Sequence, residues 1–330
     1  SEGVGVIPLQ AGAEYLMQEI AQDGPVEVVV LGPGAIIEQE VNKNLDDASL
    51  HIAFERTLCV KEFPFLQSHV MNGRAVLPVA VITEWFIHGA MHDNPGLNFL
   101  GFDDLRVFKG VTLEPDASIK LQIMAGLANK SGEIEIVPVE LRSGKTLHAR
   151  ALVILSFNRS EQPAPTIQIP SDQHPYNNKD IYNSGQLFHG TDMQGITSVD
   201  YCSEQGMVAH VKAAPHPEKW MKKPVRSSWH ADPLALDASF QMMILWSFDQ
   251  LGIGSLPTAV KSYRQYQRNF PKEGTQILIR VNEHTKHRVE ASIEFLDNSG
   301  GLVARIDGYE CVTNTSLNDA FKKNELTEPG

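Results

Sequence analysis

The sequence predicts an α+β fold in which antiparallel strands wrap around two long apolar helices. Residues 77–91 and 234–251 are apolar enough to predict two buried helices. Strand-like segments follow each helix, and residues 161–175 contain four prolines that resist both helix and sheet. The same order of elements thus occurs on either side of a proline-rich stretch, which predicts two fused halves. The repeat is one of element order, with little similarity between individual residues.

In the first half, polar and apolar residues partly alternate over 50–55, which predicts a strand before the helix. Ser143 and Gly144 predict a hairpin turn between two later strands. The strands expected after the helix are 106–113, 119–126, 133–142 and 146–157. This half therefore reads as one helix beside an antiparallel sheet.

The second half repeats this arrangement. Residues 198–212 read as strands before the helix, and 297–301 as a turn near the end. The strands expected after the helix are 276–281, 288–295 and 302–312. The predicted domain limits are 1–44 for an N-terminal remnant, 45–160 and 179–315 for the two halves, 161–178 for a linker and 316–330 for a flexible tail.

Composition limits the class of protein. The formal net charge of -12 argues against nucleic-acid binding, which depends on clustered Lys and Arg. The apolar runs are too short to span a bilayer, no signal peptide is recognisable, and the 3 cysteines form no close pair, which favours a reducing cytoplasm. One basic cluster is either a solvated face or a docking surface for an acidic partner. Its members are Lys219, Lys222, Lys223 and Arg226.

His69, Gly73 and Pro78 lie immediately before the first helix, in the segment SHVMNGRAVLP. Pro78 suits the first helical turn, and Gly73 permits a close backbone approach to a ligand. Free amides at the helix start could polarise a thioester carbonyl while His69 takes a nearby proton. A single histidine before a helix is more often structural, so this segment does not define a site by itself.

Asp237 and Gln241 are four residues apart on one face of the second helix, in ADPLALDASFQMMILW. A carboxylate among apolar side chains is costly to bury in its charged form, so we expect a raised pKa and a group able to donate a proton. A structural alternative is a carboxylate near the helix N-terminus that interacts with the helix dipole.

Together these segments resemble the dehydratase domains of polyketide and polyunsaturated fatty acid synthases, which have a double hotdog fold. Three further segments match in the same order, and the resemblance covers residues 45–313: LFHGTDMQGI, LPTAVKSYRQY and GLVARIDGYEC. The start of the chain, GAEYLMQEIAQDGPVEVVVLGPG, resembles the end of a ketoreductase domain. The resemblance implies a domain of a multidomain synthase.

The resemblance also implies a function and a set of roles. The reaction would be dehydration of a 3-hydroxyacyl thioester to the trans-2-enoyl product. His69 would be the base and Asp237 the acid, and Gln241 would orient Asp237 or the hydroxyl group. Gly73 and Gly190 would bind the thioester. The residues expected in the acyl tunnel are Leu77, Pro78, Val79, His189, Phe240, Met243 and Tyr263. The implied partners are an acyl carrier protein, whose phosphopantetheine carries the substrate, a ketoreductase domain and a second copy of the chain, with no cofactor and no membrane.

Four positions depart from the family pattern: His189 replaces a tyrosine, Thr191 a proline, Met193 a phenylalanine, and Asp232 a histidine. The altered segment 189–193 leaves a noncatalytic docking or dimer-forming domain as an alternative. A product-template cyclase and a dehydratase that also isomerises the double bond stay open as well, because the sequence does not show how wide the substrate chamber is. No metal site is expected. His88 and His92 are four residues apart and could share a metal, but the sequence offers no third ligand nearby.

Overall fold

The computed structural model describes residues 50–168, 176 and 181–327. The chain divides into two compact units, residues 1–48 and 49–330, and all of the described residues belong to the second. The ketoreductase-like segment and part of the predicted linker lie outside the described residues. Within the described part, no helix is long and apolar enough to cross a membrane.

The N-terminal half wraps strands around helix α2 (Val79–His92), which is buried along most of its length. A short sheet beside α2 carries the loop with His69. The strands of the main sheet are β1 (His51–Leu58), β4 (Asn98–Val107), β6 (Ile119–Ala125), β7 (Asn129–Ser131), β8 (Ile134–Ser143) and β9 (Thr146–Ser156). The short sheet holds β2 (Val70–Met71), β3 (Arg74–Val76) and β5 (Thr112–Leu113), and the 3-10 turn η1 (Pro64–Ser68) precedes it.

The C-terminal half wraps its strands around helix α4 (Pro233–Leu251), whose first fifteen residues are all buried. Gly252 ends α4 in a left-handed conformation, which suits a residue without a Cβ atom. The other elements are η3 (Thr191–Met193), β10 (Ile196–Ser203), β11 (Gly206–Val211), α3 (Pro217–Trp220), β12 (Ser255–Gln265), β13 (Thr275–His284), β14 (Arg288–Leu296), β15 (Leu302–Thr313) and α5 (Ser316–Lys322).

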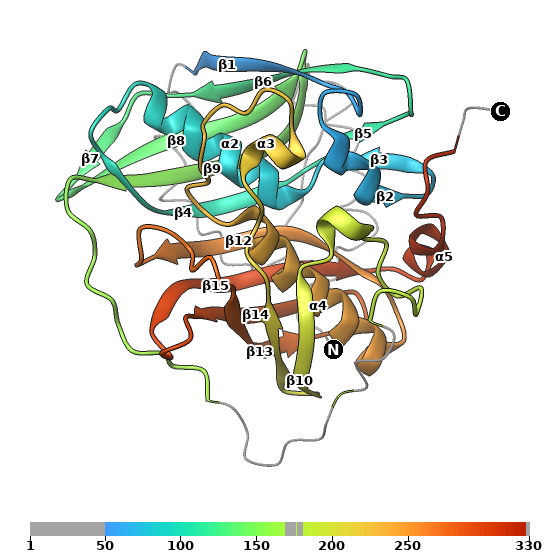
Figure 1. Ribbon diagram of the computed structural model, residues 1–330. Coiled ribbons are helices and arrows are strands. Elements are labelled where there is room, and N and C mark those ends of the chain that lie inside the picture. The colour runs from blue at the N-terminus through green and yellow to red at the C-terminus, as the bar shows by residue number, and fades with distance from the viewer. Residues whose placement is uncertain (1–49, 169–175, 177–180, 328–330) are drawn as a thin grey trace, which may run out of the picture. The chain divides into compact units, whose positions relative to one another are not determined.

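The two halves share one 12-stranded antiparallel sheet, in the order β1-β6-β8-β9-β4-β12-β15-β14-β13-β11-β10, with β7 beside β8. The halves join where β4 pairs with β12, each the first main-sheet strand after its helix. Helices α2 and α4 contact each other inside the curved sheet, and one hydrophobic core continues through both halves (Figure 1). The predicted repeat of element order is therefore real.

Two expectations about the elements differ from the structure. The single strand predicted over 106–113 covers only the end of β4 (Asn98–Val107) and the short β5 (Thr112–Leu113). Most of β4 was missed because it contains Gly101 and two aspartates, which disfavour strand by propensity. Gly101 is required there because a Cβ atom would lie 2.0 Å from the carbonyl oxygen of Tyr263 on β12. The flexible tail expected over 316–330 contains α5, whose Phe321 is fully buried.

Candidate functional site

His69 is held by the short sheet in front of α2. Its backbone follows η1 and its carbonyl accepts a hydrogen bond from the Val76 N–H, at 2.9 Å. Its Nδ1 lies 2.7 Å from the Val76 carbonyl oxygen. A carbonyl can only accept, so Nδ1 carries the proton and Nε2 keeps its lone pair. His69 therefore presents a basic nitrogen in a fixed direction.

Asp237 lies in the second turn of α4 and is 4% exposed. The Gln241 Nε2 donates to its Oδ2 at 2.7 Å and also to the carbonyl oxygen of Met193 at 2.7 Å. The Tyr182 hydroxyl donates to Gln241 Oε1 at 2.8 Å and so fixes which end of the amide faces Asp237. Gln241 thus orients Asp237, which is one of the two roles that the resemblance implies for it.

The structure brings His69 and Asp237 together from opposite halves of the chain. His69 Nε2 lies 4.0 Å from Asp237 Oδ1, and His189 Nε2 lies 3.4 Å from Asp237 Oδ2. A backbone bridge pairs His69 with His189, and the Gly190 N–H donates to the Ser68 carbonyl oxygen at 2.8 Å. The two segments are therefore joined by main-chain contacts, which fixes the distance between their side chains.

Burial sets the protonation states of this site. It lowers the pKa of His69 to about 4, an effect that the Val76 hydrogen bond only partly offsets. It raises the pKa of Asp237 to about 7, against the hydrogen bond from Gln241. It also holds the pKa of His189 well below its ordinary value, to which His69 adds a smaller effect. Near neutral pH the site holds a neutral imidazole base and a carboxyl group close to its midpoint of titration.

Asp232, which stands where the family has a histidine, begins α4. Its carboxylate accepts hydrogen bonds from the N–H groups of Leu234 and Ala235, at 3.0 and 2.8 Å, and from that of Ala214. It is therefore the N-cap that sets where α4 starts, five residues before Asp237. The replacement of histidine by aspartate thus keeps a polar side chain at position 232, where it caps the N-terminus of α4.

Glu84 of α2 holds the segment that leads into α4. Its carboxylate accepts from the backbone N–H groups of His230 and Ala231, at 2.7 and 3.0 Å, and contacts His88 Nε2 at 3.0 Å. Glu84 is 1% exposed, so these bonds form where water does not compete. The helix of the first half thus positions α4, the helix that carries Asp237.

The expected thioester-binding role of Gly73 does not agree with the structure. The Gly73 N–H donates to the Lys323 carbonyl oxygen at 2.9 Å, and its carbonyl accepts from the Thr327 N–H at 3.1 Å. The C-terminal segment therefore occupies both polar groups of Gly73. The Gly190 N–H is likewise occupied, by Ser68 as described above.

The start of α2 offers the better donors for a thioester oxygen. No side chain caps this helix, and within the described part of the chain the Val79 and Ala80 N–H groups have no hydrogen-bond acceptor. Such amides carry the positive end of the helix dipole. They follow closely on Val76, the residue that orients the His69 ring.

The predicted tunnel residues occupy different environments. Leu77, Phe240 and Met243 are buried in the common core, where Phe240 stacks on Tyr309 with ring centroids 5.2 Å apart. Burial raises the pKa of Tyr309, and the charge of Asp237 raises it further, so Tyr309 lies near the site. The sequence analysis did not predict Tyr309 as a site residue. Tyr263 instead stacks on Phe102 and donates to Gln265, which indicates a structural role.

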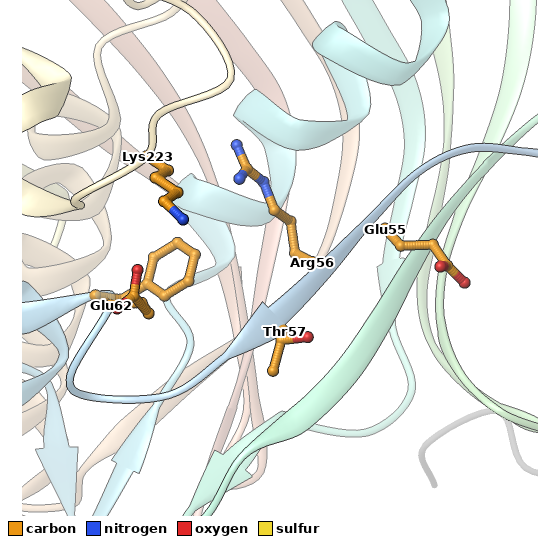
Figure 2. Close-up of a pocket in the computed structure, with 6 residues that line it drawn as sticks. Glu55, Arg56, Thr57, Glu62 and Lys223 are labelled. Carbon is orange, nitrogen blue, oxygen red and sulfur yellow. The ribbon is translucent and has the colours of Figure 1, made fainter.

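The basic cluster lies beside the edge strand β1. Lys223, Arg56 and Glu62 line a pocket of about 290 Å³, and Figure 2 shows the ends of Lys223 and Arg56 directed into the same space. Lys222 pairs with Glu62 at 3.6 Å, whereas Lys223 and Arg56 have no ion-pair partner among the described residues. Partial burial lowers the pKa of Arg56. The pocket therefore holds two basic side chains without an ion-pair partner in the described part of the chain. They lie beside Glu55 and Glu62, whose carboxylates pair with Lys120 and Lys222.

The rest of the cluster is divided between this pocket and its neighbour. Arg226 lines an adjoining pocket of about 410 Å³, which shares Arg56, and donates to His88 Nδ1 at 3.1 Å. Lys219 is exposed on α3. His88 is therefore bound between Glu84 and Arg226 and is not available to share a metal with His92.

Tyr182 and Glu84 are functional-site residues that the sequence did not reveal. Tyr182 also accepts a hydrogen bond from the Ile196 N–H at 2.7 Å, so it joins β10 to Gln241. Glu84 lies four residues before His88 on α2, a spacing that could have suggested their contact. Tyr182 belongs to no recognisable spacing.

Comparison with known proteins indicates the family that this chain resembles. The family described as the polyketide synthase dehydratase N-terminal domain matches residues 160–319, a segment that includes His189, Asp237 and Gln241. This part of the chain matches the polyketide synthase dehydratase family. The chain is also 26% identical over 323 residues to a polyunsaturated fatty acid synthase polypeptide of Thraustochytrium sp., a match that covers 95% of this chain and 11% of that protein.

Solved dehydratase domains have the same fold. The domain of a trans-AT polyketide synthase from Brevibacillus brevis superimposes with a TM-score of 0.64 at 19% identity, covering 79% of this chain and 93% of that one. The domain of a mycocerosic acid synthase-like polyketide synthase gives 0.61 at 21% identity, covering 81% and 92%. The domain from the CurF module of the curacin synthase gives 0.64 at 15% identity, covering 80% and 93%. The predicted double hotdog fold is confirmed.

Proposed function

We propose that this domain removes water from a 3-hydroxyacyl thioester to give the trans-2-enoyl thioester, with His69 as base and Asp237 as acid. The observation that carries the proposal is the buried pair itself, a lone pair on His69 Nε2 4.0 Å from a carboxyl group whose pKa is about 7. General acid–base catalysis requires such a pair within reach of one substrate.

His69 and Asp237 together supply every proton transfer of the reaction. His69 Nε2 takes the proton from C2 while the thioester oxygen gains charge, and we assign the Val79 and Ala80 amides as its donors. The bond between C3 and oxygen breaks, and Asp237 gives its proton to the departing hydroxyl, which leaves as water. The proton on His69 then returns to Asp237, which restores both groups. This scheme uses no cofactor.

The relatives support the choice of reaction. Two structural neighbours, the dehydratases of the CurJ and CurK modules, are described as inactive mutants in which one histidine is replaced by phenylalanine. The polyunsaturated fatty acid synthase relative is a far longer protein, of which this chain spans 11%. We therefore propose an acyl carrier protein and neighbouring synthase domains such as a ketoreductase as partners. The three unpaired cysteines fit a cytoplasmic protein.

Hydration of a crotonyl thioester by the purified chain tests the proposal, because dehydration is reversible. The expected product is the 3-hydroxybutyryl thioester. A rate no higher than that of the buffer would favour a noncatalytic domain. A shifted double bond, or a cyclised product from a longer polyketide substrate, would identify the isomerase or the cyclase.

The rate should depend on pH through the same pair. Either direction requires the pair to hold one proton, which it does between the pKa of His69, about 4, and that of Asp237, about 7. We expect kcat/KM to fall about tenfold per pH unit above pH 7, as Asp237 loses its proton. Measurement from pH 6 to 9, with folding checked by circular dichroism, tests this. A flat profile over this range would contradict the assigned acid.

The pocket with Lys223 and Arg56 gives the docking proposal a specific test. Lys223→Glu should lower kcat/KM for a carrier-bound substrate by roughly 3- to 10-fold, most strongly at low salt, because a charge at the rim acts mainly on association. A small pantetheine thioester should be used at the wild-type rate. Lys145→Glu, in the exposed hairpin between β8 and β9, is the matched control. Equal losses on both substrates would contradict docking at this pocket.

A further inference from the structure

His69, His189 and Asp237 each direct one potential metal-ligand atom into the same buried space. These atoms lie within 4.8 Å of one another, and all three side chains are at least nine-tenths buried. Two imidazoles and one carboxylate form a donor set that binds divalent transition metals. We propose that this site binds one Zn²⁺ ion, or its analogue Co²⁺, and that the bound metal blocks the dehydratase reaction.

The distances are close to those of a coordinated metal. Zinc bonds of about 2.0–2.1 Å in a tetrahedron place the donor atoms about 3.3 Å apart. His189 Nε2 lies 3.4 Å from Asp237 Oδ2, and His69 Nε2 lies 4.0 Å from Asp237 Oδ1. Taken one per residue, the three donor atoms lie within 4.8 Å of one another. Small side-chain rotations are therefore enough to bring the three donors to a metal, without movement of the joined backbone segments.

Neighbouring groups already orient two of the three ligands. The Nδ1–H of His69 donates to the Val76 carbonyl, which leaves Nε2 as the donor atom, and Gln241 holds Asp237. Such outer contacts are typical of metal-binding histidines and carboxylates. His189 supplies the third donor, and its Nδ1 has no partner among the described residues.

The metal would inhibit because it uses the reacting atoms. The lone pair of His69 Nε2 would be bound to the ion, so it could not take the proton from C2. Asp237 would be bound as a carboxylate and could not donate a proton. This inhibition rests on the proposed function, whereas metal binding itself does not.

A second cluster, on the surface, could bind the same ions and must be separated from this one. His51 Nε2 and His92 Nε2 lie 2.6 and 4.0 Å from the carboxylate of Asp93. All three side chains are exposed to between 45% and 60%. The double variant His51→Gln/His92→Gln removes this cluster and leaves the buried one unchanged.

Titration of the tag-free chain with Co²⁺, followed by visible absorption, tests the binding. We expect one tight site per chain with the intense bands of low-coordinate cobalt. His189→Phe should weaken it by at least about tenfold, the lower end of the effect of losing even an outer contact. Asp237→Asn should weaken it too and serves if His189→Phe does not fold. The surface double variant should bind as the wild type does.

Three results would overturn the proposal. These are no Co²⁺ binding by the wild type, unchanged binding by Asp237→Asn, or loss of the tight site in the surface double variant. Inhibition is tested separately by adding Zn²⁺ to the crotonyl thioester assay, where we expect competition with substrate and recovery with a chelator. Binding without inhibition would overturn the blocking role alone. A chain with no hydratase rate would contradict the proposed function but leave the cobalt result intact.

Discussion

Asp237→Asn and His69→Ala should each lower kcat/KM for crotonyl thioester hydration by about 10²- to 10⁴-fold, the range that a general acid or base contributes. Asparagine keeps the shape of Asp237 and can still accept the Gln241 hydrogen bond, but it has no proton to transfer. Alanine at position 69 removes the lone pair that takes the C2 proton. Since both groups act in one elimination, the double variant should be little slower than the slower single variant.

His92→Gln is the matched control for these substitutions, since His92 is exposed at the end of α2. It should hydrate the thioester at the wild-type rate. Steady-state kinetics on all four variants, with folding checked by circular dichroism, decide the matter. If either single variant retained the wild-type rate, that residue would not carry the reaction.

The fold could be predicted from the sequence because the same pattern, an apolar helix followed by strands, occurs twice. The long apolar segments became α2 and α4, each starting and ending within two residues of the predicted limits. The position of β4 was predicted wrongly, because Gly101 and the neighbouring aspartates lie where β4 pairs with β12. That pairing joins residues about 160 positions apart in the chain. Local propensity does not record such a contact.

The site could be predicted in part, for a similar reason. The pairing of His69 with Asp237 follows from two halves that each present one helix to a shared core. The role of Gly73 could not be predicted correctly, because its amide is occupied by Lys323, 250 residues later in the chain. The metal site that we propose could not be recognised in the sequence, because His69, His189 and Asp237 have no regular spacing, whereas His88 and His92 do.

The docking residues, too, could be predicted only in part from the sequence. Lys222 and Lys223 are adjacent and equivalent in the sequence, yet Lys222 pairs with Glu62 while Lys223 shares a pocket with Arg56 from β1. Arg56 was not among the predicted docking residues, because it lies far from the basic cluster along the chain. A charge pattern locates a basic region, but only the fold shows which of its side chains have an ion-pair partner.

The second large effect expected is on stability, where Asp237→Asn should stabilise the protein above pH 7. The folded-state pKa of Asp237, about 7, lies above its ordinary value of 3.8. Below pH 3.8 the group is protonated in both states and has no effect on stability. Between pH 3.8 and 7 the unfolded chain releases the proton that the native chain keeps, so native stability falls as pH rises. Above pH 7 Asp237 is ionised in both states, and the whole loss of native stability caused by the buried carboxylate is present.

This cost is the free energy of a buried carboxylate, and asparagine does not carry it. The shift corresponds to no more than about 4 kcal/mol. The difference in unfolding free energy between variant and wild type should therefore grow from near zero at pH 4 to a plateau above pH 7. Urea denaturation at pH 4.5 and pH 8 measures it. Asp307→Asn, at an exposed position of β15, should change stability by less than about 0.5 kcal/mol at either pH.

The sign of this effect bears on the function. His69 and His189 also have shifted pKa values, but they are present in both proteins, so the difference between variants isolates Asp237. A variant that is catalytically impaired yet more stable at pH 8 would show that the buried carboxyl group of Asp237 destabilises the fold and is kept for the reaction. A variant that is less stable at pH 8 would instead show that Asp237 is a structural anion, and the assignment of Asp237 as the acid would then fail.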